Sequence, residues 1–336
     1  PRIDFSDDAN GALKLEPQST NLITYSEDFS NASWVKVAGA ITSNVGVSPD
    51  GTLNADRFYS AVSASNTRTY SDYTFSAATY TFSVYAKKNG SNNYFRFSIT
   101  DSSGQTFTPD FQLTNEWQRF EYTYTSTGGS GSWWVVNPST SELSSEFDLL
   151  IYGAQLEQNS YATSYIKNEG TSAGITRSAD TCSQTLPDGV IGQTEGVLYS
   201  EFIVNGFANF GTPLCINNGT TSESIWLTTF GNGDIRAEVF SANSGGIQAT
   251  FTKSGNIVGT LYKIALRYAN NNFAFFINGI QVGATDLSGA LPLSMNRVDF
   301  DYTNASSFSK SSLNILNAKL YNTGLSNAEL QALTTI

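Results

Sequence analysis

The side chains that could do chemistry in this sequence are carboxylates and aromatics, because the chain of 336 residues contains no histidine. Without imidazole there is no Ser–His–Asp or Cys–His pair, no histidine general base, and no zinc or iron site with imidazole ligands. A reaction that uses two carboxylates remains open, as does a calcium site built from oxygen ligands. Most enzyme classes are therefore excluded before any motif is considered.

Glycoside hydrolysis needs two carboxylates that face each other across a cleft, about 5–10 Å apart. Both halves of the chain offer candidates: Glu116, Glu121, Glu142, Glu146, Asp148, Glu157, Asp234, Glu238, Asp299 and Asp301. None of them stands in a motif typical of hydrolases or lyases, and solvated surface carboxylates explain them all. We therefore expect no enzyme, and keep a depolymerase that uses a carboxylate pair as an alternative.

Aromatic side chains could bind sugars, because a sugar ring stacks its C–H face on an exposed aromatic ring. The 22 Phe, 17 Tyr and 5 Trp mostly fill cores, so only an aromatic forced outward is informative. Trp133 and Trp134 are consecutive, and in a strand one of the two must leave the core. The outward Trp is either a stacking platform or a side chain covered by another domain or protomer.

Three further aromatics are weaker candidates for glycan contact. Trp226 alternates with Ile225 and Leu227, and burial against the sheet or helix is the favoured interpretation. Tyr70 and Tyr73 lie in a polar, loop-like stretch.

Charge and composition exclude other partners. Charged residues make up 14% of the chain and the net charge is −11, with no cluster of Lys and Arg, which argues against nucleic acid and anionic membranes. No stretch reaches the ~20 apolar residues that span a bilayer, so no membrane insertion is expected. The sequence opens at Pro1 with neither a Met nor an apolar run, so we expect a fragment without a signal peptide.

The two cysteines, Cys182 and Cys215, are open to two interpretations. They either form a disulfide or are two buried thiols in separate strands, since spacing alone does not determine pairing. Neither is expected to be catalytic, because no histidine exists to activate a thiol.

Short alternating segments separated by Gly, Asn and Ser turns predict a β-sandwich in the first half. The expected strands cover 80–86, 94–99, 117–124, 133–136 and 147–152. Residues 168–189 break this rhythm with small polar residues, and predict a linker. The sequence is thus divided into an N-terminal extension (1–18), a first domain (19–167), the linker, and a second domain (190–336).

The second half shows the same strand pattern with two sharper signals. Asn278-Gly279 between apolar runs predicts a tight hairpin, because both residues tolerate positive φ. Ser326 followed by Glu329 fits a capping box and predicts a short C-terminal helix. The fold class is therefore all-β, two sandwiches with one short helix at the end.

Several motifs of the first half belong together. They are Leu15-Glu16-Pro17-Gln18-Ser19-Thr20-Asn21-Leu22, Tyr25-Ser26-Glu27-Asp28-Phe29, Ala32-Ser33-Trp34, Ser48-Pro49-Asp50-Gly51-Thr52, Phe82-Ser83-Val84-Tyr85-Ala86-Lys87, Trp117-Gln118-Arg119-Phe120, Gly153-Ala154-Gln155-Leu156-Glu157, Ser160-Tyr161-Ala162-Thr163-Ser164-Tyr165-Ile166 and Thr176-Arg177-Ser178-Ala179-Asp180. Together they resemble a recurrent module of bacteriophage tail-fibre and other virion proteins, which is similar to jelly-roll carbohydrate-binding modules. The second half, with Phe276-Ile277-Asn278-Gly279 and Tyr321–Leu330, is similar to concanavalin A-like, laminin-G-like sandwiches.

This resemblance implies a non-catalytic adhesin of a phage virion, extracellular, that binds a polysaccharide or other glycan of the host surface. It also implies a homotrimer, since such fibres are commonly trimeric. The alternatives are the depolymerase and a purely structural spacer of the virion.

The resemblance also raises the question of a structural calcium, although no cofactor is required. Related carbohydrate modules often end their last strand with an Asp that helps to hold calcium. Here the stretch Tyr152–Gln155 has no carboxylate before Glu157. Glu27, Asp28 and Glu157 are the candidate oxygen ligands in the first domain.

Overall fold

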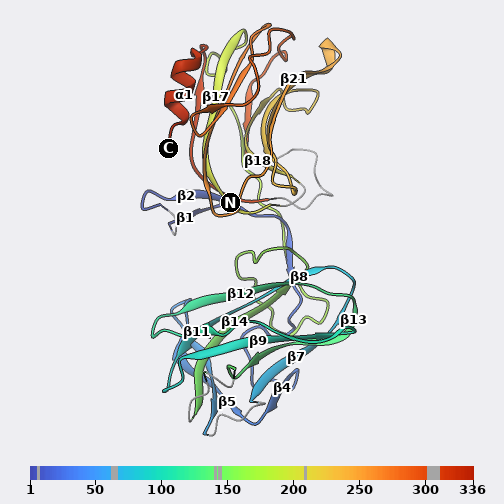
Figure 1. Cartoon of the computed structure of the whole chain (residues 1–336), viewed down its shortest axis with the longest axis vertical. Helices are drawn as coiled ribbons and strands as arrows, with labels where there is room; N and C mark the ends of the chain where they lie inside the picture. The colour runs from blue at the N-terminus through green and yellow to red at the C-terminus, as the bar shows by residue number, and fades with distance from the viewer. Residues whose placement is uncertain (6–7, 62–66, 140–141, 143–145, 208–209, 301–310) are drawn as a thin grey trace. The chain divides into compact units, whose positions relative to one another are not determined.

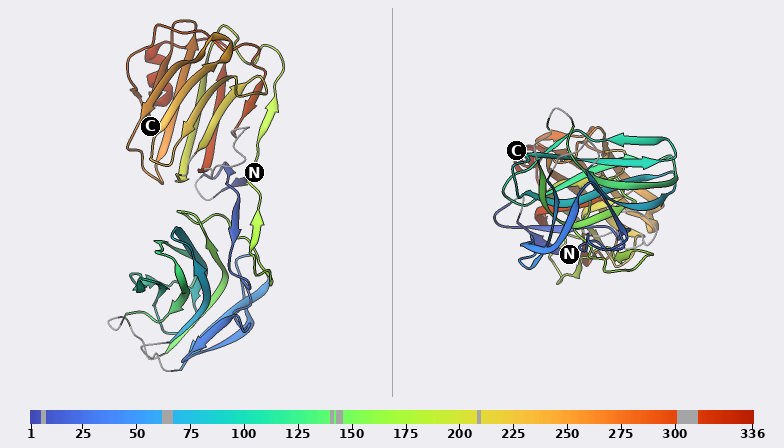
Figure 2. Two further views of the ribbon diagram at one scale, coloured as in Figure 1. Left: turned by 90° about the vertical axis from the view of Figure 1, so that its right-hand side faces the viewer. Right: turned by 90° about the horizontal axis from the view of Figure 1, so that it is seen from below.

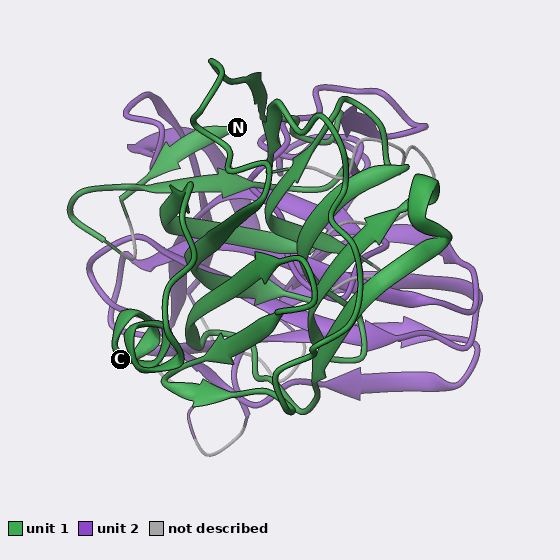
Figure 3. Cartoon of the chain, turned by 90° about the horizontal axis from the view of Figure 1, so that it is seen from above, with its two compact units in different colours: residues 1–18, 178–336 green, residues 19–177 purple. Residues whose placement is uncertain are grey.

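The computed structural model describes residues 1–5, 8–61, 67–139, 142, 146–207, 210–300 and 311–336. Its contacts divide the chain into two units, which Figure 3 draws in different colours. We call residues 19–177 the N-terminal sandwich, and residues 1–18 together with 178–336 the C-terminal sandwich.

The N-terminal sandwich consists of two main antiparallel sheets, several of whose strands are labelled in Figure 1. The first sheet contains, in spatial order, β10 (Gly104–Phe107), β9 (Tyr94–Asp101), β13 (Gly129–Val136), β7 (Arg68–Phe75) and β4 (Trp34–Val37), with β11 (Phe111–Gln112) paired to β9. The second contains β12 (Gln118–Thr125), β8 (Thr79–Lys88), β14 (Phe147–Glu157), β6 (Leu53–Ser60) and β5 (Ala40–Val47). A two-stranded ribbon of β3 (Ser19–Asn21) and β15 (Ile175–Arg177) completes the unit.

Alternation along the strands places the apolar side chains of both sheets in one core. Phe82 of β8, Phe97 of β9 and Trp133 of β13 are fully buried there. The rings of Phe82 and Trp133 stack with centroids 5.1 Å apart. Trp133 is therefore a core residue that joins the two sheets.

The C-terminal sandwich also has two antiparallel sheets, whose layers are visible in Figure 2. A seven-stranded sheet has the order β1 (Arg2–Asp4), β2 (Ala12–Leu15), β26 (Ser312–Tyr321), β17 (Glu195–Gly206), β22 (Leu261–Ala269), β23 (Ala274–Ile277) and β24 (Ile280–Gln281). A six-stranded sheet has the order β16 (Ser183–Thr185), β25 (Arg297–Asp299), β18 (Gly211–Asn217), β19 (Glu223–Thr229), β20 (Ile235–Ser241) and β21 (Gly246–Lys253). A 3₁₀ turn, Ala242–Ser244, precedes β21.

Both sharp signals of the second half are confirmed. Asn278 and Gly279 connect β23 to β24 with φ of 48° and 77°. Ser326 is the N-cap of helix α1 (Asn327–Thr334). Its side chain accepts a hydrogen bond from the backbone N–H of Glu329, and the Glu329 carboxylate accepts one from the backbone N–H of Ser326. Leu330 of α1 is fully buried against the seven-stranded sheet. The prediction of an all-β fold of sandwiches with one short C-terminal helix is confirmed.

Two segments expected to lie outside the domains form strands. Residues 1–18, expected as an extension, provide β1 and β2, and β2 pairs with β26. The expected linker 168–189 contains β15 and β16, which pair with β3 and β25. These strands are three or four residues long, too short for their periodicity to be read, and β2, β15 and β16 pair with strands far away in the sequence.

The cysteines do not form a disulfide, so that interpretation of Cys182 and Cys215 is wrong. Cys215 lies in β18 opposite Asp299, and Cys182 precedes β16 on the other side of β25. Two strand spacings, about 9.5 Å, therefore separate their backbones, more than the roughly 7 Å that a disulfide can bridge. Burial raises the pKa of the Cys215 thiol well above its usual range.

In the part of the chain that the structure describes, no helix has the length and apolar character needed to cross a membrane.

Candidate functional site

Strand β13 separates the two consecutive tryptophans as alternation predicts. Trp133 points into the core with no exposed surface, whereas Trp134 is half-buried on the outward side of the sheet. Because β13 is the middle strand, with β7 and β9 on either side, Trp134 is flanked by residues of both neighbours. The outward Trp is thus Trp134.

Trp134 belongs to a row of side chains that crosses five strands. Tyr70 of β7 lies opposite Trp134, and Val35 of β4 lies opposite Tyr70. On the other side, Ser98 of β9 lies opposite Trp134 and Phe107 of β10 opposite Ser98. The rings of Tyr70 and Trp134 are 5.2 Å apart between centroids and inclined by 31°. The sequence-predicted candidates Trp134 and Tyr70 are therefore brought together.

A second row on the same side carries two cations. Arg68 and Arg96 lie opposite Val136, one on each neighbouring strand. The guanidinium carbon of Arg68 is 4.7 Å from the Trp134 ring centroid, and that of Arg96 is 4.1 Å from the Phe107 centroid. Such contacts hold a guanidinium by cation–π attraction.

A third row is polar and lies on the other side of the aromatic row. It contains Asp72, Ser132, Thr100 and Gln105 in register across four strands. The hydroxyls of Thr100 and Ser132 are 2.7 Å apart, and the indole N–H of Trp134 donates to the Ser132 hydroxyl.

We call these three rows together the platform face. Aromatic rings offer a surface for the C–H faces of sugars, and the hydroxyl, amide and carboxylate groups beside them can exchange hydrogen bonds with sugar hydroxyls. The sequence did not predict Arg68, Arg96 and Phe107 as site residues, because only the pairing of separate strands brings them to one surface.

Tyr73 does not belong to the platform face. Its stretch, expected to be loop-like, forms strand β7, and Tyr73 points to the opposite side from Tyr70. It packs at the edge of the core, with its ring 5.0 Å from Phe75 and 6.0 Å from Tyr80. The stretch was expected to be a loop because it contains many polar residues, and several of these residues occupy outward positions of β7.

Trp226 lies on the outward side of the six-stranded sheet in the C-terminal sandwich, and we call this surface the Trp226 face. Cys215 and Glu238 lie opposite Trp226 on the two neighbouring strands. The side chain is half-buried, and the ring of Phe210 meets it edge-on at 6.4 Å. Burial raises the pKa of Glu238, whereas the nearby Arg236 opposes this shift.

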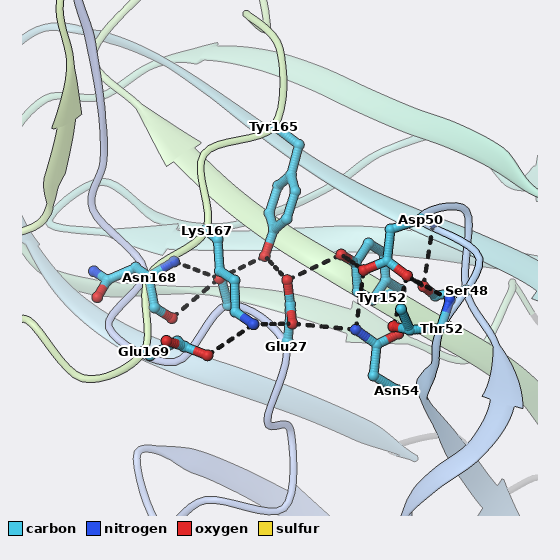
Figure 4. A network of polar contacts seen from close by, with 11 residues as sticks. Glu27, Ser48, Asp50, Thr52, Asn54, Tyr152, Tyr165, Lys167, Asn168 and Glu169 are labelled. Atoms are coloured by element: carbon cyan, nitrogen blue, oxygen red, sulfur yellow. Dashed lines mark hydrogen bonds and ion pairs between the residues drawn. The ribbon is translucent and has the colours of Figure 1, made fainter.

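Besides these two faces, the described residues contain a network of polar contacts around Glu27 in the N-terminal sandwich (Figure 4). The ammonium group of Lys167 is 3.0 Å from the Glu27 carboxylate and 2.7 Å from that of Glu169. The hydroxyl of Tyr152 donates to Glu27 and to Asp50, at 2.9 Å each. Figure 4 shows Lys167 and Tyr152 approaching Glu27 from different sides. Glu27 is thus held by a cation and by hydroxyl donors.

A cavity of about 480 Å³ opens beside this network, lined among others by Glu27, Asp56 and Lys167. Asp56 is 1% exposed, and its carboxylate accepts the backbone N–H groups of Phe29 (2.9 Å) and Asn44 (3.0 Å). Burial raises the pKa of Asp56 to about 6, although the two hydrogen bonds oppose this shift. The carboxylate therefore titrates well above the usual range.

The candidate calcium ligands are not gathered in one place. Glu157 is fully buried and accepts the backbone N–H of Thr163 (2.9 Å) and the hydroxyl of Ser19 (2.5 Å). Asp28 accepts the backbone N–H groups of Ser30 and Asn31, while Glu27 is held by Lys167. Among the described residues, no group of three or more His, Cys, Asp or Glu side chains is arranged to hold a metal ion. Calcium binding stays a prediction.

Several candidate carboxylates for hydrolysis have structural partners. Asp148 forms an ion pair with Arg57 (2.7 Å), and Asp299 one with Arg297 (3.0 Å). Side-chain hydrogen bonds from Ser254 and from the Asn232 amide lower the pKa of Asp234. Asp301 lies outside the described residues.

No protein-family model matches the chain, and no curated protein sequence matches it. Among solved structures, the chain is similar to the CBM40 module of the Ruminococcus gnavus IT-sialidase bound to α2,3-sialyllactose, with 18% identity over 43% of this chain and 84% of the module and a TM-score of 0.36. It is also similar to the leech intramolecular trans-sialidase (16% identity, 46% of this chain and 26% of that one, TM-score 0.37). A third is the binding domain of botulinum neurotoxin serotype G (12% identity, 49% and 43%, TM-score 0.39). At these identities and TM-scores, no function of this chain follows from the likeness.

Proposed function

We propose that the chain is a non-catalytic glycan-binding protein, and that the platform face of the N-terminal sandwich is its binding surface. The observation that supports this most directly is the row of Tyr70, Trp134 and Phe107, in which Ser98 of β9 lies between Trp134 and Phe107. Three aromatic side chains in one row match the flat, repetitive surface of a polysaccharide better than the shape of a compact small molecule.

The biological setting that we propose is adhesion of a bacteriophage virion to its host. The support for this setting is the resemblance of residues 15–180 to the module of tail-fibre and virion proteins, together with a surface suited to extended glycans. The chain would be an extracellular part of the virion, such as a tail fibre or appendage, assembled as a homotrimer. Several weak sites on one particle then act together, so that each site can be weak.

The experiment is binding of the purified chain to a microbial glycan array and to intact bacterial cells, with Trp134→Ala as the test variant and Trp226→Ala as its matched control. We expect both variants to stay folded, and only Trp134→Ala to lose the glycans that the parent chain retains. Loss of binding in Trp226→Ala alone would move the site to the C-terminal sandwich.

Two other outcomes would overturn the proposal. If no glycan or cell binds while the chain forms a trimer that shields Trp134, the chain is a structural spacer. If the chain shortens a bound polysaccharide, and mutation of a single carboxylate stops this, the chain is a depolymerase.

A further inference from the structure

The cations of the platform face are confined to one of its three rows. Arg68 and Arg96 lie on one side of the aromatic row, and the single carboxylate among the three rows, Asp72, lies on the other. The face therefore has a cationic side and a polar side, in a chain whose net charge is −11. Such local asymmetry predicts a ligand with its own negative charge directed to the arginines.

The spacing of the two arginines suits one sugar residue and its neighbour in a chain. Arg68 and Arg96 lie on strands that flank β13, so their backbones are about 9.5 Å apart. Adjacent rows on one side of a sheet are about 6.7 Å apart. An exocyclic carboxylate on a pyranose held against Trp134 thus reaches the row of Arg68 and Arg96. The hydroxyls of the same pyranose reach the polar row that contains Asp72.

An aromatic ring lies against each of the two guanidiniums, as one also does at Arg57 and Arg236. Arg57 and Arg297 have in addition carboxylate partners, Asp148 and Asp299, at 2.7 and 3.0 Å. Arg96 lies over Phe107, and its Nε is buried with no hydrogen-bond partner among the described residues. A guanidinium stacked on a ring keeps the N–H groups at its edge directed sideways, where a carboxylate can accept two of them.

We propose that the platform face selects acidic glycans, in which Arg68 and Arg96 bind the carboxylates of uronate, sialate or similar sugar residues while Trp134 and Tyr70 hold the rings. This inference rests on the proposed function, because it assigns the ligand class of the same surface. Arg68 and Arg96 are then its specificity-determining residues.

The test compares acidic polysaccharides with the same polymers after their carboxylates have been reduced to alcohols. The probes are polygalacturonate, hyaluronan, polysialic acid and a panel of acidic and neutral bacterial capsular polysaccharides, with binding measured by calorimetry and biolayer interferometry. We expect the parent chain to bind an acidic polymer at least tenfold more tightly than its reduced form. This preference should shrink as NaCl is raised from 50 to 300 mM.

The variants separate the inference from the proposed function. Arg68→Gln/Arg96→Gln should lose the preference for the acidic polymer and keep the weaker binding of the reduced one. Arg236→Gln, which removes a guanidinium 4.4 Å from the Phe230 ring on the C-terminal sandwich, should change neither. Trp134→Ala should lose both polymers.

Equal binding of acidic and reduced polymers, or a preference that survives in the double arginine variant, would overturn the inference and leave the proposed function standing. Binding of neutral polysaccharides alone would do the same. If the folded parent chain binds none of the probes, both proposals are contradicted. Thermal unfolding of each variant establishes that a loss of binding is not a loss of the fold.

Discussion

The platform face and the Trp226 face are built on the same plan and have different chemistry. Each places a tryptophan on the outward side of a strand within an antiparallel sheet. Trp134 has Tyr70 and the guanidinium of Arg68 beside it, whereas Trp226 has Cys215 and Glu238 opposite it. Strand alternation therefore decides that a side chain turns outward, and the neighbouring strands decide what it can bind.

The raised pKa of Glu238 adds to this contrast. A carboxylate whose pKa rises through burial lies where water solvates it poorly, so the surroundings of Trp226 are partly closed.

The largest effect is expected from Trp133→Ala, because Trp133 fills the core beneath the platform face. Loss of its stack on Phe82 and of its buried surface should lower the free energy of unfolding by about 3–5 kcal/mol. Trp134→Ala, one position away, should cost about 1 kcal/mol or less. Urea unfolding followed by circular dichroism measures both. Equal losses would mean that Trp134 is a core residue and not part of a binding surface.

The next effect is a pH dependence of the N-terminal sandwich through Asp56. Its pKa in the folded state, about 6, lies above the ordinary value of 3.8, so the folded state binds this proton more tightly. Stability should therefore increase as the pH falls from 7 to about 4, by up to about 2–3 kcal/mol. Below pH 4 the trend should reverse, because Asp50 and Asp101 have lowered pKa values and lose their hydrogen-bonded, ionised form.

Urea unfolding at pH 5 and pH 7 checks this dependence. Asp56→Asn should remove most of the difference between the two pH values, at the cost of one of the two backbone hydrogen bonds. A variant that keeps the full pH dependence would assign it to another group.

A smaller effect on binding is expected from Tyr70→Ala. Tyr70 extends the aromatic surface beside Trp134, so its removal should weaken glycan binding by up to about tenfold, roughly 1.4 kcal/mol. Phe230→Ala is the matched control, since Phe230 also has a guanidinium over its ring but belongs to the C-terminal sandwich. Calorimetry with the strongest glycan of the array distinguishes them, and a larger loss in Phe230→Ala would contradict the assignment.

The smallest effect concerns a sheet of the C-terminal sandwich that is covered by a helix. Ser326→Ala removes the side-chain acceptor of the capping box and should lower the free energy of unfolding by about 1 kcal/mol. Glycan binding should not change. Hydrogen exchange should quicken in α1 first, and unchanged exchange there would show that packing of Leu330 alone holds the helix.

The sequence predicts the local features of this fold well. The Asn278-Gly279 hairpin, the capping box of α1 and the separation of Trp133 from Trp134 each depend on neighbouring residues and on the geometry of one element. For the candidate site, alternation required one of the two tryptophans to face outward, and the structure shows that this is Trp134.

The rest depends on pairing between distant segments. Arg68 and Arg96 meet at Val136 only because β7 and β9 both pair with β13. Cys182 and Cys215 are kept apart by β25, a strand that begins more than eighty residues after Cys215. No local pattern reports such pairings, which is why the cationic row was not predicted and why the choice between a disulfide and two free thiols stayed open.

The pairing of β2 with β26 has a consequence for how the chain folds during its synthesis. Leu13 and Leu15 lie opposite Ile315 and Leu313, so the seven-stranded sheet cannot close until the ribosome has released the segment near residue 320. The N-terminal sandwich, 19–177, is continuous and can fold much earlier. Until then the strand Ala12–Leu15 lacks its partner β26, and its apolar residues are open to chaperones or to pairing with another nascent chain.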